Sequence, residues 1–388
     1  MSSDTKVNTM SNHFIGVHLL YPAVAANVNS EKSGSQKTTT YGRVRRALWS
    51  SQAQKRQTRL DFSADLPYAQ QATRTRRHDL VAEKLVTDHG WDIDAAADLC
   101  ERIWSAATGG EKGKGLVLTG ADIVERAVAA IEAAPGARQV TATLAAKLPA
   151  KTKPEYNEAK HQQDLAKKIV ADIADGLFRD QHNVTIAFHG RMMADKPELT
   201  VEAAVHIASG ISVDPWGDQN VDYWTAVDDH NTDDISAGNM GVRDRGTNLF
   251  YRYASINLAT LARNIGCDRA EAEEYARQWA WAFINAKPTR SESSTAPYAD
   301  PIFVGVHRPR NPLALHPFFN KPITELDQHR IATEKLLAYY SGQQHALGRD
   351  DKLTYWTSTD AGEPPAKTEQ VETVMAVLDR IHAAQESV

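Results

Sequence analysis

Apolar and polar positions follow two different patterns along the chain, and together they predict an α+β fold. Short apolar runs with few polar interruptions are typical of buried strands, and they occur near residues 14, 184, 250 and 302. Between the first two runs, apolar residues such as Cys100, Ile103 and Trp104 recur at helical spacing. We therefore expect a sheet with helices on one face and a helical insertion of roughly 100 residues.

The same pattern places the individual helices. Stretches without Pro or Gly, rich in Ala, Gln, Lys, Arg and Glu, favour helix over strand. We expect helices over residues 47–59, 78–106, 120–134, 157–177, 202–209, 258–264, 269–287, 324–341 and 367–384. Residues 23–41 are rich in Asn, Ser, Lys and Thr and predict a loop. The run 302–307 is expected to be the last strand.

Charge is distributed unevenly, which changes the meaning of the acidic average. The chain has 44 Lys and Arg against 49 Asp and Glu, a formal net charge of −5. Residues 41–77 carry nine basic residues against two acidic ones, a net charge of +7, which leaves −12 for the rest. Residues 211–234 hold seven Asp and no Lys or Arg. The average is therefore no argument against a polyanionic partner.

Composition excludes membrane-spanning and disulfide-rich classes. Hydrophobic residues make up 42% of the chain, and no apolar run approaches the ~18 residues of a membrane span. The polar N-terminal residues 1–12 contain no apolar signal core, so we expect a cytoplasmic protein. The only cysteines, Cys100 and Cys267, exclude a disulfide scaffold and a multi-thiolate metal site. We expect both thiols to be buried and reduced.

Common catalytic motifs are missing. The sequence has no His-Glu-x-x-His, Cys-x-x-Cys or Gly-x-Ser-x-Gly, so zinc and serine hydrolase sites have no support. The glycine-rich run 109–115 resembles a phosphate loop but lacks its first Gly, its final Ser or Thr and a preceding strand, so a linker is favoured. Two acidic pairs are either a Mg²⁺ site or a solvated surface: Asp228, Asp229, Asp233 and Asp234. We expect no catalytic residue, no metal and no cofactor.

The basic segment is the strongest candidate for function. No acidic residue interrupts positions 41–60, so like charges have no local compensation. In a helix, Lys55 and Arg59 would share one face, and Ser51 and Gln52 would lie at its start, where backbone N–H groups favour phosphate. An ordinary solvated basic helix is the alternative. The missing compensation favours phosphate binding.

The acidic stretch contains large apolar residues in a polar, glycine-bearing context. These are Tyr223, Trp224, Val227 and Met240. They either pack back onto their own domain or form an exposed hairpin tip that wedges between bases or into a neighbouring subunit. The acidic residues would then meet a basic patch on the next copy. The pattern alone leaves both interpretations open.

Several blocks of the sequence resemble one known family. Gly42-Arg-Val-Arg-Arg, Ser50-Ser-Gln and Lys55-Arg56 are similar to its signature Arg-x-Arg-x-Ser-Ser-Gln-x-x-Lys-Arg. Further blocks agree in order: Phe14-Ile-x-Val-His18, Ile186-Ala-x-x-Gly-Arg-Met192, Asp222-Tyr-Trp-Thr-Ala-Val-Asp-Asp229 and Phe250-Tyr-Arg-Tyr-Ala-x-Ile-Asn-Leu258. Over about residues 13–310 the chain resembles the CasC family, the backbone (RAMP superfamily) subunit of the type I-E CRISPR Cascade complex.

The resemblance implies an α+β fold with an RRM-like (ferredoxin-like) palm, a large helical insertion called the fingers, and a thumb hairpin. The palm strands would be the apolar runs named above. The implied division is palm with an RNA-gripping helix at 13–60, fingers at 61–180, palm at 181–211, thumb at 212–248, and palm with C-terminal helices at 249–388. The sequence has no RNP aromatic pattern, which indicates that the sheet does not stack bases.

The resemblance also implies roles for individual residues. RNA-binding residues would be Arg43, Arg45, Arg46, Ser50, Ser51, Gln52, Lys55, Arg56, Arg59 and Arg191. The thumb wedge that displaces a base would contain Met192, Tyr223, Trp224, Val227 and Met240. Candidates for contact with target DNA are Lys147, Lys151 and Lys153.

The implied function is a non-enzymatic subunit that polymerises head-to-tail along CRISPR RNA and presents it for pairing with target DNA in antiviral defence. Its partners would be CRISPR RNA, target DNA through the guide, further copies of itself and other Cascade subunits. One alternative is a type III-like RAMP endoribonuclease that cuts target RNA with a loop Asp. Another is a metabolic enzyme with an incidental basic helix.

Overall fold

The computed structural model divides the chain into two compact units. The first comprises Met1–Phe62, Val205–Ala259 and Asp268–Val388, and the second comprises Ser63–Ala204 and Thr260–Cys267. The described residues are 14–75, 77–109, 116–179, 183–193, 196–217, 220–224 and 240–382.

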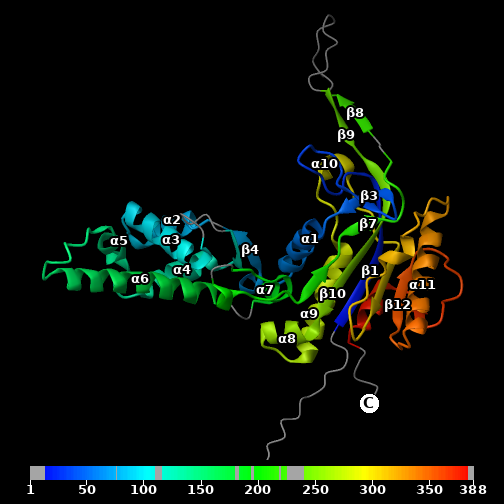
Figure 1. Cartoon of the computed structure of the whole chain (residues 1–388). Helices are drawn as coiled ribbons and strands as arrows, with labels where there is room; N and C mark the ends of the chain where they lie inside the picture. The colour runs from blue at the N-terminus through cyan, green and yellow to red at the C-terminus, as the bar shows by residue number, and fades with distance from the viewer. Residues whose placement is uncertain are drawn as a thin grey trace, which may run out of the picture. The chain divides into compact units, whose positions relative to one another are not determined.

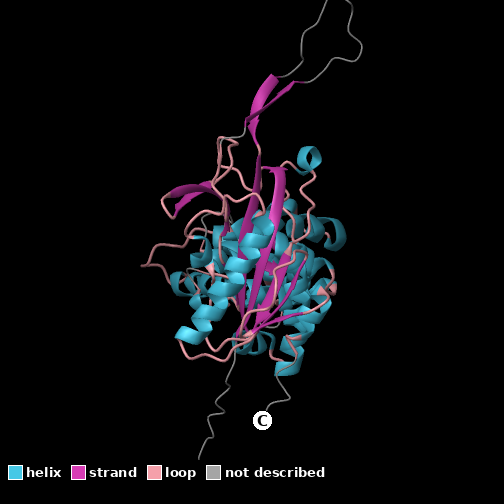
Figure 2. Ribbon diagram, turned by 90° about the vertical axis from the view of Figure 1, so that its right-hand side faces the viewer, coloured by secondary structure: helices cyan, strands magenta, loops and turns pink. Residues whose placement is uncertain are grey.

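The first unit is built on one sheet, whose long strands run side by side in Figure 2. Its order is β13 (Thr368–Gln370), β12 (Leu353–Thr357), β11 (Phe303–His307), β1 (Phe14–Ala26), β10 (Gly246–Asn257), β7 (Gly210–Ser212), β3 (Val44–Trp49) and β2 (Thr38–Tyr41). A ninth strand, β6 (Val205–Ile207), also pairs with β10. The β12–β13 pair is parallel and the other pairs are antiparallel.

The centre of this sheet has the ferredoxin-like arrangement. In chain order the elements are β1, helix α1 (Ser51–Ala64), β6 and β7, β10, helix α9 (Arg269–Asn285) and β11. In space the strands lie as β11–β1–β10–β7, which is the strand order of two interleaved β-α-β units. The predicted fold class, an α+β RRM-like palm, is confirmed.

Neighbouring residues of β10 point to opposite faces of the palm sheet. Arg252 donates hydrogen bonds to Gln54 of α1 and to the carbonyl oxygen of Phe283 in α9, so both helices cover its face. Tyr251 lies in the opposite core with Phe319 and Leu336. Those two residues belong to η4 (His316–Phe319) and α11 (Gln328–Ala346). Both faces of β10 are therefore buried by helical layers.

The second unit is helical, with a short strand pair at its edge. Its elements are η1 (Tyr68–Gln70), β4 (Ala72–Thr75), α2 (Asp79–His89), α3 (Ile93–Thr108), β5 (Val117–Gly120), α4 (Ile123–Ala133), α5 (Ala137–Ala145), α6 (Tyr156–Phe178), α7 (Val184–His189) and η3 (Pro197–Leu199), labelled where space allows in Figure 1. Apolar residues of α3 at i, i+3, i+4 and i+7 face α6 and α2 in one core. Cys100 lies in this core, and burial raises the pKa of its thiol to about 12.

The remaining elements are short. They are β8 (Asn220–Trp224), β9 (Met240–Asp244), α8 (Leu258–Ile265), α10 (Glu292–Thr295) and α12 (Val374–Asp379). Cys267, which was expected to be buried, is half-buried.

Two segments form a different type of secondary structure from the one that the sequence predicts. Residues 184–189, predicted as a palm strand, form helix α7 in the second unit, because Asn183 caps the helix by accepting from the backbone N–H of Ile186 at 2.9 Å. Every residue of α7 is buried, so the run carries no helical periodicity. Conversely, the predicted helix 202–209 contains strand β6, which obtains its hydrogen bonds by pairing with β10.

The start of α1 and the C-terminal region also differ from the sequence prediction. Residues 44–49, partly predicted as helix, form strand β3, and 38–41, predicted as loop, form its hairpin partner β2. Two strands, β12 and β13, follow the strand that was expected to be last. The predicted helix 367–384 is divided into β13 and α12. Both C-terminal strands complete the sheet through backbone pairing, which apolar periodicity does not encode.

Candidate nucleic-acid interface

A tight hairpin presents the first arginine of the basic segment. Strands β2 and β3 are joined at Gly42 and Arg43, whose φ values of 60° and 65° are those of a type I′ turn. Gly42 is required for a second reason, because a Cβ there would lie 1.8 Å from the carbonyl oxygen of Asn320. The turn therefore holds the exposed Arg43 at the hairpin tip.

The next two arginines have different environments although they are adjacent. Arg45 is exposed, and its Nε donates to the hydroxyl of Thr38 across the hairpin. Arg46 is fully buried and donates to the carbonyl oxygens of Ser212 at 2.9 Å and Phe319 at 3.1 Å. The alternation of strand β3 produces this difference. The role implied for Arg46 is not supported, since its guanidinium joins β3 to β7 and η4 inside the palm.

Helix α1 begins directly after this hairpin, and Ser50 is its cap. The Ser50 hydroxyl accepts from the backbone N–H of Ala53 at 3.3 Å, and the Ser50 N–H donates to Asn29 Oδ1 at 3.0 Å. Ser50 is buried, whereas Ser51 is half-buried and Gln52 is exposed. Ser50 therefore has a structural role, and the phosphate contact implied for it stays a prediction. The first turn of α1 still favours an anion, because its dipole is positive there.

A buried polar contact fixes α1 to the sheet. Gln54 Oε1 accepts from Arg252 Nε at 2.9 Å, and Gln54 Nε2 donates to the carbonyl oxygens of Trp49 and Ala208. The Arg252 guanidinium also lies 4.5 Å from the ring centroids of Trp49 and Phe283. Neither Gln54 nor Arg252 was among the residues predicted from the sequence to matter for function. The sequence signal that could have indicated Gln54 is a Gln on the inward face of a helix whose outward face is basic.

The remaining basic residues of α1 divide by helical face. Arg56 is exposed, Lys55 is half-buried and Arg59 is 8% exposed. The exposed side chains of Arg43, Arg45, Gln52 and Arg56 thus form a run along one hairpin and one helix, which we call the basic strip. Arg59 is largely withdrawn from it.

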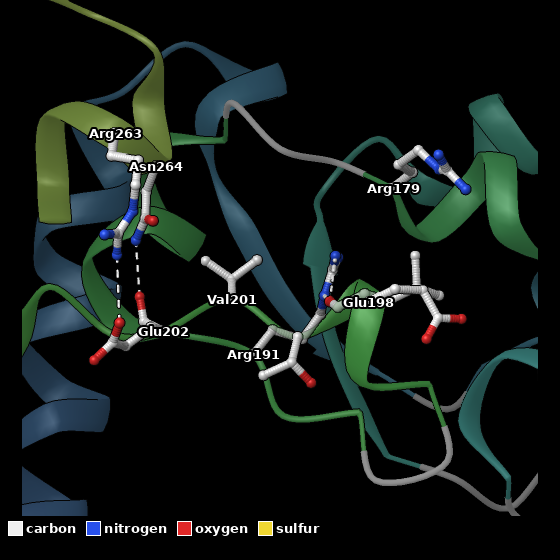
Figure 3. A pocket seen from close by; sticks show the side chains of 9 residues that line it. Arg179, Arg191, Glu198, Val201, Glu202, Arg263 and Asn264 are labelled. Atoms are coloured by element: carbon white, nitrogen blue, oxygen red, sulfur yellow. Dashed lines mark hydrogen bonds and ion pairs between the residues drawn. The ribbon is translucent and has the colours of Figure 1, made fainter. Parts of the chain in front are cut away.

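Arg191 lies in the second unit and is buried at the wall of a small cavity of about 290 Å³. Its guanidinium donates to the carbonyl oxygens of Leu199 and Phe178. In Figure 3, Arg263 and Asn264 both reach Glu202 on another wall of the same cavity. These contacts make Arg191 a structural residue, so its implied role in RNA binding is not supported. The neighbouring Met192 is 84% exposed.

The predicted thumb contains a two-stranded hairpin, β8–β9, whose register separates the residues of the expected wedge. Tyr223 pairs with Gly241, and Trp224 pairs with Met240. Tyr223 therefore lies on one face, while the 73% exposed Met240 lies on the other. Val227 and the four candidate metal-binding aspartates lie outside the described residues.

The structure also places the three lysines that are candidates for contact with target DNA. Lys147, Lys151 and Lys153 are exposed in the segment between α5 and α6 of the second unit. The glycine-rich run follows helix α3 and precedes strand β5, which is opposite to the order of a phosphate loop.

Within the described ranges, no group of three or more His, Cys, Asp or Glu is arranged to hold a metal ion. Among the described helices, none has the length and apolar character needed to cross a membrane.

Comparison with solved structures identifies the fold. A chain described as "CRISPR RNA-guided surveillance complex, pre-nicking" superposes with a TM-score of 0.79 at 24% identity, covering 96% of this chain and 99% of that chain. A chain described as "CRISPR RNA-guided surveillance complex" superposes with a TM-score of 0.69 at the same identity and coverage. No curated protein matches the chain.

Comparison with family models gives a match over nearly the whole sequence. The model named Cas_CT1975, described as CT1975-like protein, matches residues 15–382. This range covers residues of both units and, apart from Phe14, all the palm elements described above. The chain therefore belongs to the CT1975-like family.

Proposed function

We propose that the protein is a backbone subunit that binds CRISPR guide RNA in a surveillance complex. The observation that carries the proposal is the basic strip, whose exposed side chains stand on a hairpin and a helix fixed to the palm. Membership of the CT1975-like family supports it, as does a fold shared with chains of CRISPR RNA-guided surveillance complexes. The proposed role is binding without a catalytic step.

The chemistry of the strip favours the RNA backbone over its bases. Guanidinium groups and a helix N-terminus bind phosphates, which position a strand without reading its sequence. The tyrosines of β10 that face away from α1 are buried in the palm core, so they are not accessible for base stacking. A guide held by its backbone keeps its bases free to pair with a target, and pairing then supplies sequence specificity.

In its finer form the proposal is a CasC-type subunit of a type I-E Cascade complex. Copies would polymerise head-to-tail along the guide in the cytoplasm, and the thumb hairpin would act on RNA held by a neighbouring copy. The exposed Met192 and Met240 are available for such a wedge, and Lys147, Lys151 and Lys153 for target DNA. The endoribonuclease alternative depends on aspartates outside the described residues, so no described residue favours it.

The test is assembly and RNA binding by the full chain. Co-expression with CRISPR RNA and the other complex subunits should yield a large assembly with nucleic-acid absorbance. For the residues, Arg43→Gln with Arg56→Gln should lower the slope of log affinity against log salt by about 1.4, or about 0.7 for each lost contact. Lys352→Gln with Lys367→Gln is the matched control, because both lysines are exposed and the charge change is equal.

Two results would contradict the proposal. An RNA-free monomer after co-expression would exclude a backbone role. Metal-dependent cutting of target RNA would favour the endoribonuclease instead.

A further inference from the structure

The root of the thumb hairpin holds a polar cleft of about 420 Å³. Its walls are strand β9, the loop 27–36 and the segment 290–295, all within the first unit. The lining includes three arginines and one carboxylate: Arg243, Arg245, Arg290 and Asp244. Hydroxyl groups of six Ser and Thr residues, from Ser33 to Thr295, complete it. None of these residues belongs to the basic strip.

Two of the three arginines of the cleft donate hydrogen bonds to neutral groups. Arg245 donates to the carbonyl oxygen of Ser294 at 2.9 Å and to its hydroxyl at 3.2 Å. Arg290 Nε donates to the Ser30 hydroxyl at 2.8 Å. These bonds orient the two guanidinium groups without neutralising them. Asp244 accepts a long bond of 3.4 Å from the Gln36 N–H.

The third arginine is oriented by an aromatic ring. The Arg243 guanidinium lies 4.4 Å from the ring centroid of Tyr223, and both residues are on the same face of the hairpin. Gly241 makes room for this ring, because a Cβ there would lie 2.8 Å from it. A guanidinium stacked on a ring keeps its N–H edge available for a phosphate. The hairpin face therefore presents a preoriented cation to the cleft.

The loop that lines the cleft is tied to the start of α1. Asn29 accepts the Lys37 N–H at 2.7 Å on its carbonyl oxygen and the Ser50 N–H at 3.0 Å on its side chain. Gln36 Nε2 donates to the carbonyl oxygen of Leu48 at 3.0 Å. The cleft wall and the N-terminus of α1 are thus joined by short hydrogen bonds through one residue, Asn29.

We propose that this cleft binds phosphate groups of RNA, as a contact separate from the basic strip. Three guanidinium groups with several hydroxyl donors against a single carboxylate match an anion rich in acceptor oxygens. The volume is in the range of small-ligand sites and admits about one nucleotide. The choice of RNA as the source of the phosphate rests on the proposed function. Continuity with the start of α1 favours a strand over a free nucleotide.

The test measures binding of a fluorescent oligouridine by the full chain at several salt concentrations. Arg243→Gln with Arg290→Gln should lower the salt slope by about 1.4, because two phosphate contacts are lost. Arg243→Lys with Arg290→Lys keeps the charge and should keep most of the slope. The Lys352→Gln, Lys367→Gln control should leave the slope unchanged. Both arginines are exposed, and an unchanged melting temperature would verify that the variants fold.

The outcomes separate this inference from the proposed function. If Arg43→Gln with Arg56→Gln lowers the slope and the cleft pair does not, the cleft proposal is overturned while RNA binding stands. If neither pair changes the slope, the basic-strip proposal fails as well.

Two further measurements would identify a different occupant of the cleft. Loss of 5′-AMP binding in the cleft pair with an unchanged oligouridine slope would assign a free-nucleotide site. Loss of self-association with an unchanged slope would assign an acidic segment of a second copy. Either result overturns the RNA proposal.

Discussion

At the centre of the palm sheet, the two sides of strand β10 bury polar groups in opposite ways. On the α1 face, the fully buried Arg252 remains a cation, although burial lowers its pKa to about 9. It is stabilised by Gln54, by the carbonyl oxygens of Phe283 and Ala286, and by aromatic rings. On the opposite side of β10, the buried polar groups around Tyr251 are neutral, whereas the buried Arg46 of β3 donates to the carbonyl oxygens of Ser212 and Phe319. At β10, one side therefore holds a charge by complete coordination, and the other side carries a neutral hydrogen-bonded chain.

The neutral face contains a linear hydrogen-bonded chain. Tyr251 Oη accepts the Leu315 N–H at 2.9 Å and is 2.8 Å from His18 Nδ1, and His18 Nε2 is 2.9 Å from His307 Nδ1. All contacts are satisfied when Tyr251 donates to His18 and His18 donates to His307. Burial lowers the pKa of His18 well below its usual value, and the neighbouring His307 lowers it further.

Under the proposed function, this difference would allow the palm to hold RNA without using its sheet. The hydrogen bonds of Arg252 fix α1 to the sheet, so the outer side of the helix is available for the proposed phosphate contacts. The neutral chain and helix α11 close the aromatic face, which the sequence already indicated by its missing RNP pattern. The expected interface is therefore at the β2–β3 hairpin and α1, and the predictions below test each face.

The largest effect is expected on the charged face. Arg252→Ala should lower the free energy of unfolding by about 4 kcal/mol, because it leaves a cavity and three buried acceptors without their donor. Urea denaturation measures the loss. A loss below about 1 kcal/mol would show that α1 is held mainly by other contacts.

The neutral face should make stability sensitive to acid. Burial lowers the pKa of His307 to about 3, whereas an unfolded His titrates near 6.5. The unfolded state then binds the proton more readily, so this contribution is complete above pH 6.5 and is lost as pH falls toward 3. The loss is at most about 1.4 kcal/mol per pH unit for this group. His307→Gln should flatten the pH dependence in this window, and an equal slope in both proteins would refute the assignment.

A smaller loss is expected from crowding the same face. Gly16 lies opposite His307 in the β1–β11 pair, and a Cβ there would be 2.7 Å from His307 Nε2. Gly16→Ala should cost about 2 kcal/mol as an overpacked site. In a His307→Ala background the same change should cost much less, because the clashing ring is gone. Equal costs in both backgrounds would place the strain elsewhere.

The smallest effect on stability is expected at the exposed arginines of the basic strip. Arg43→Gln and Arg56→Gln should each change the free energy of unfolding by less than about 0.5 kcal/mol, as exposed substitutions usually do. A loss above about 1 kcal/mol at either position would indicate a structural role and remove that residue from the proposed interface. The contrast with Arg252 separates arginines that hold the palm from those available to bind.

Sequence patterns predicted the long elements and missed elements that depend on distant partners. Helix α6 carries a regular apolar face and was expected at nearly its observed position, whereas the helix predicted over 78–106 is divided into α2 and α3 at Gly90. Helix α7 is buried on all sides, so its sequence matched a strand equally well. Strand β6 is short and obtains its hydrogen bonds from β10, about fifty residues further along the chain.

The candidate site shows the same division. The sequence located the basic segment by charge, since a run of nine basic residues against two acidic ones is visible without a fold. It did not distinguish Arg45 from Arg46, because the exposure of a strand residue depends on which face is covered. The cleft at the root of the thumb was also invisible, since its arginines come from β9 and from a segment about fifty residues later.

By itself the sequence determined where charge accumulates, which helices are amphipathic and which motifs for catalysis are missing, because these properties are local. The tertiary structure decided which cations are buried, which stay accessible and which distant groups share a cleft. The physical reason is that burial and hydrogen-bond partners are set by strand order and by the layers on each face. Arg252 and Arg56 are the same type of residue. The fold buries Arg252 in the palm core, where it holds α1 to the sheet, and leaves Arg56 exposed as a candidate phosphate contact.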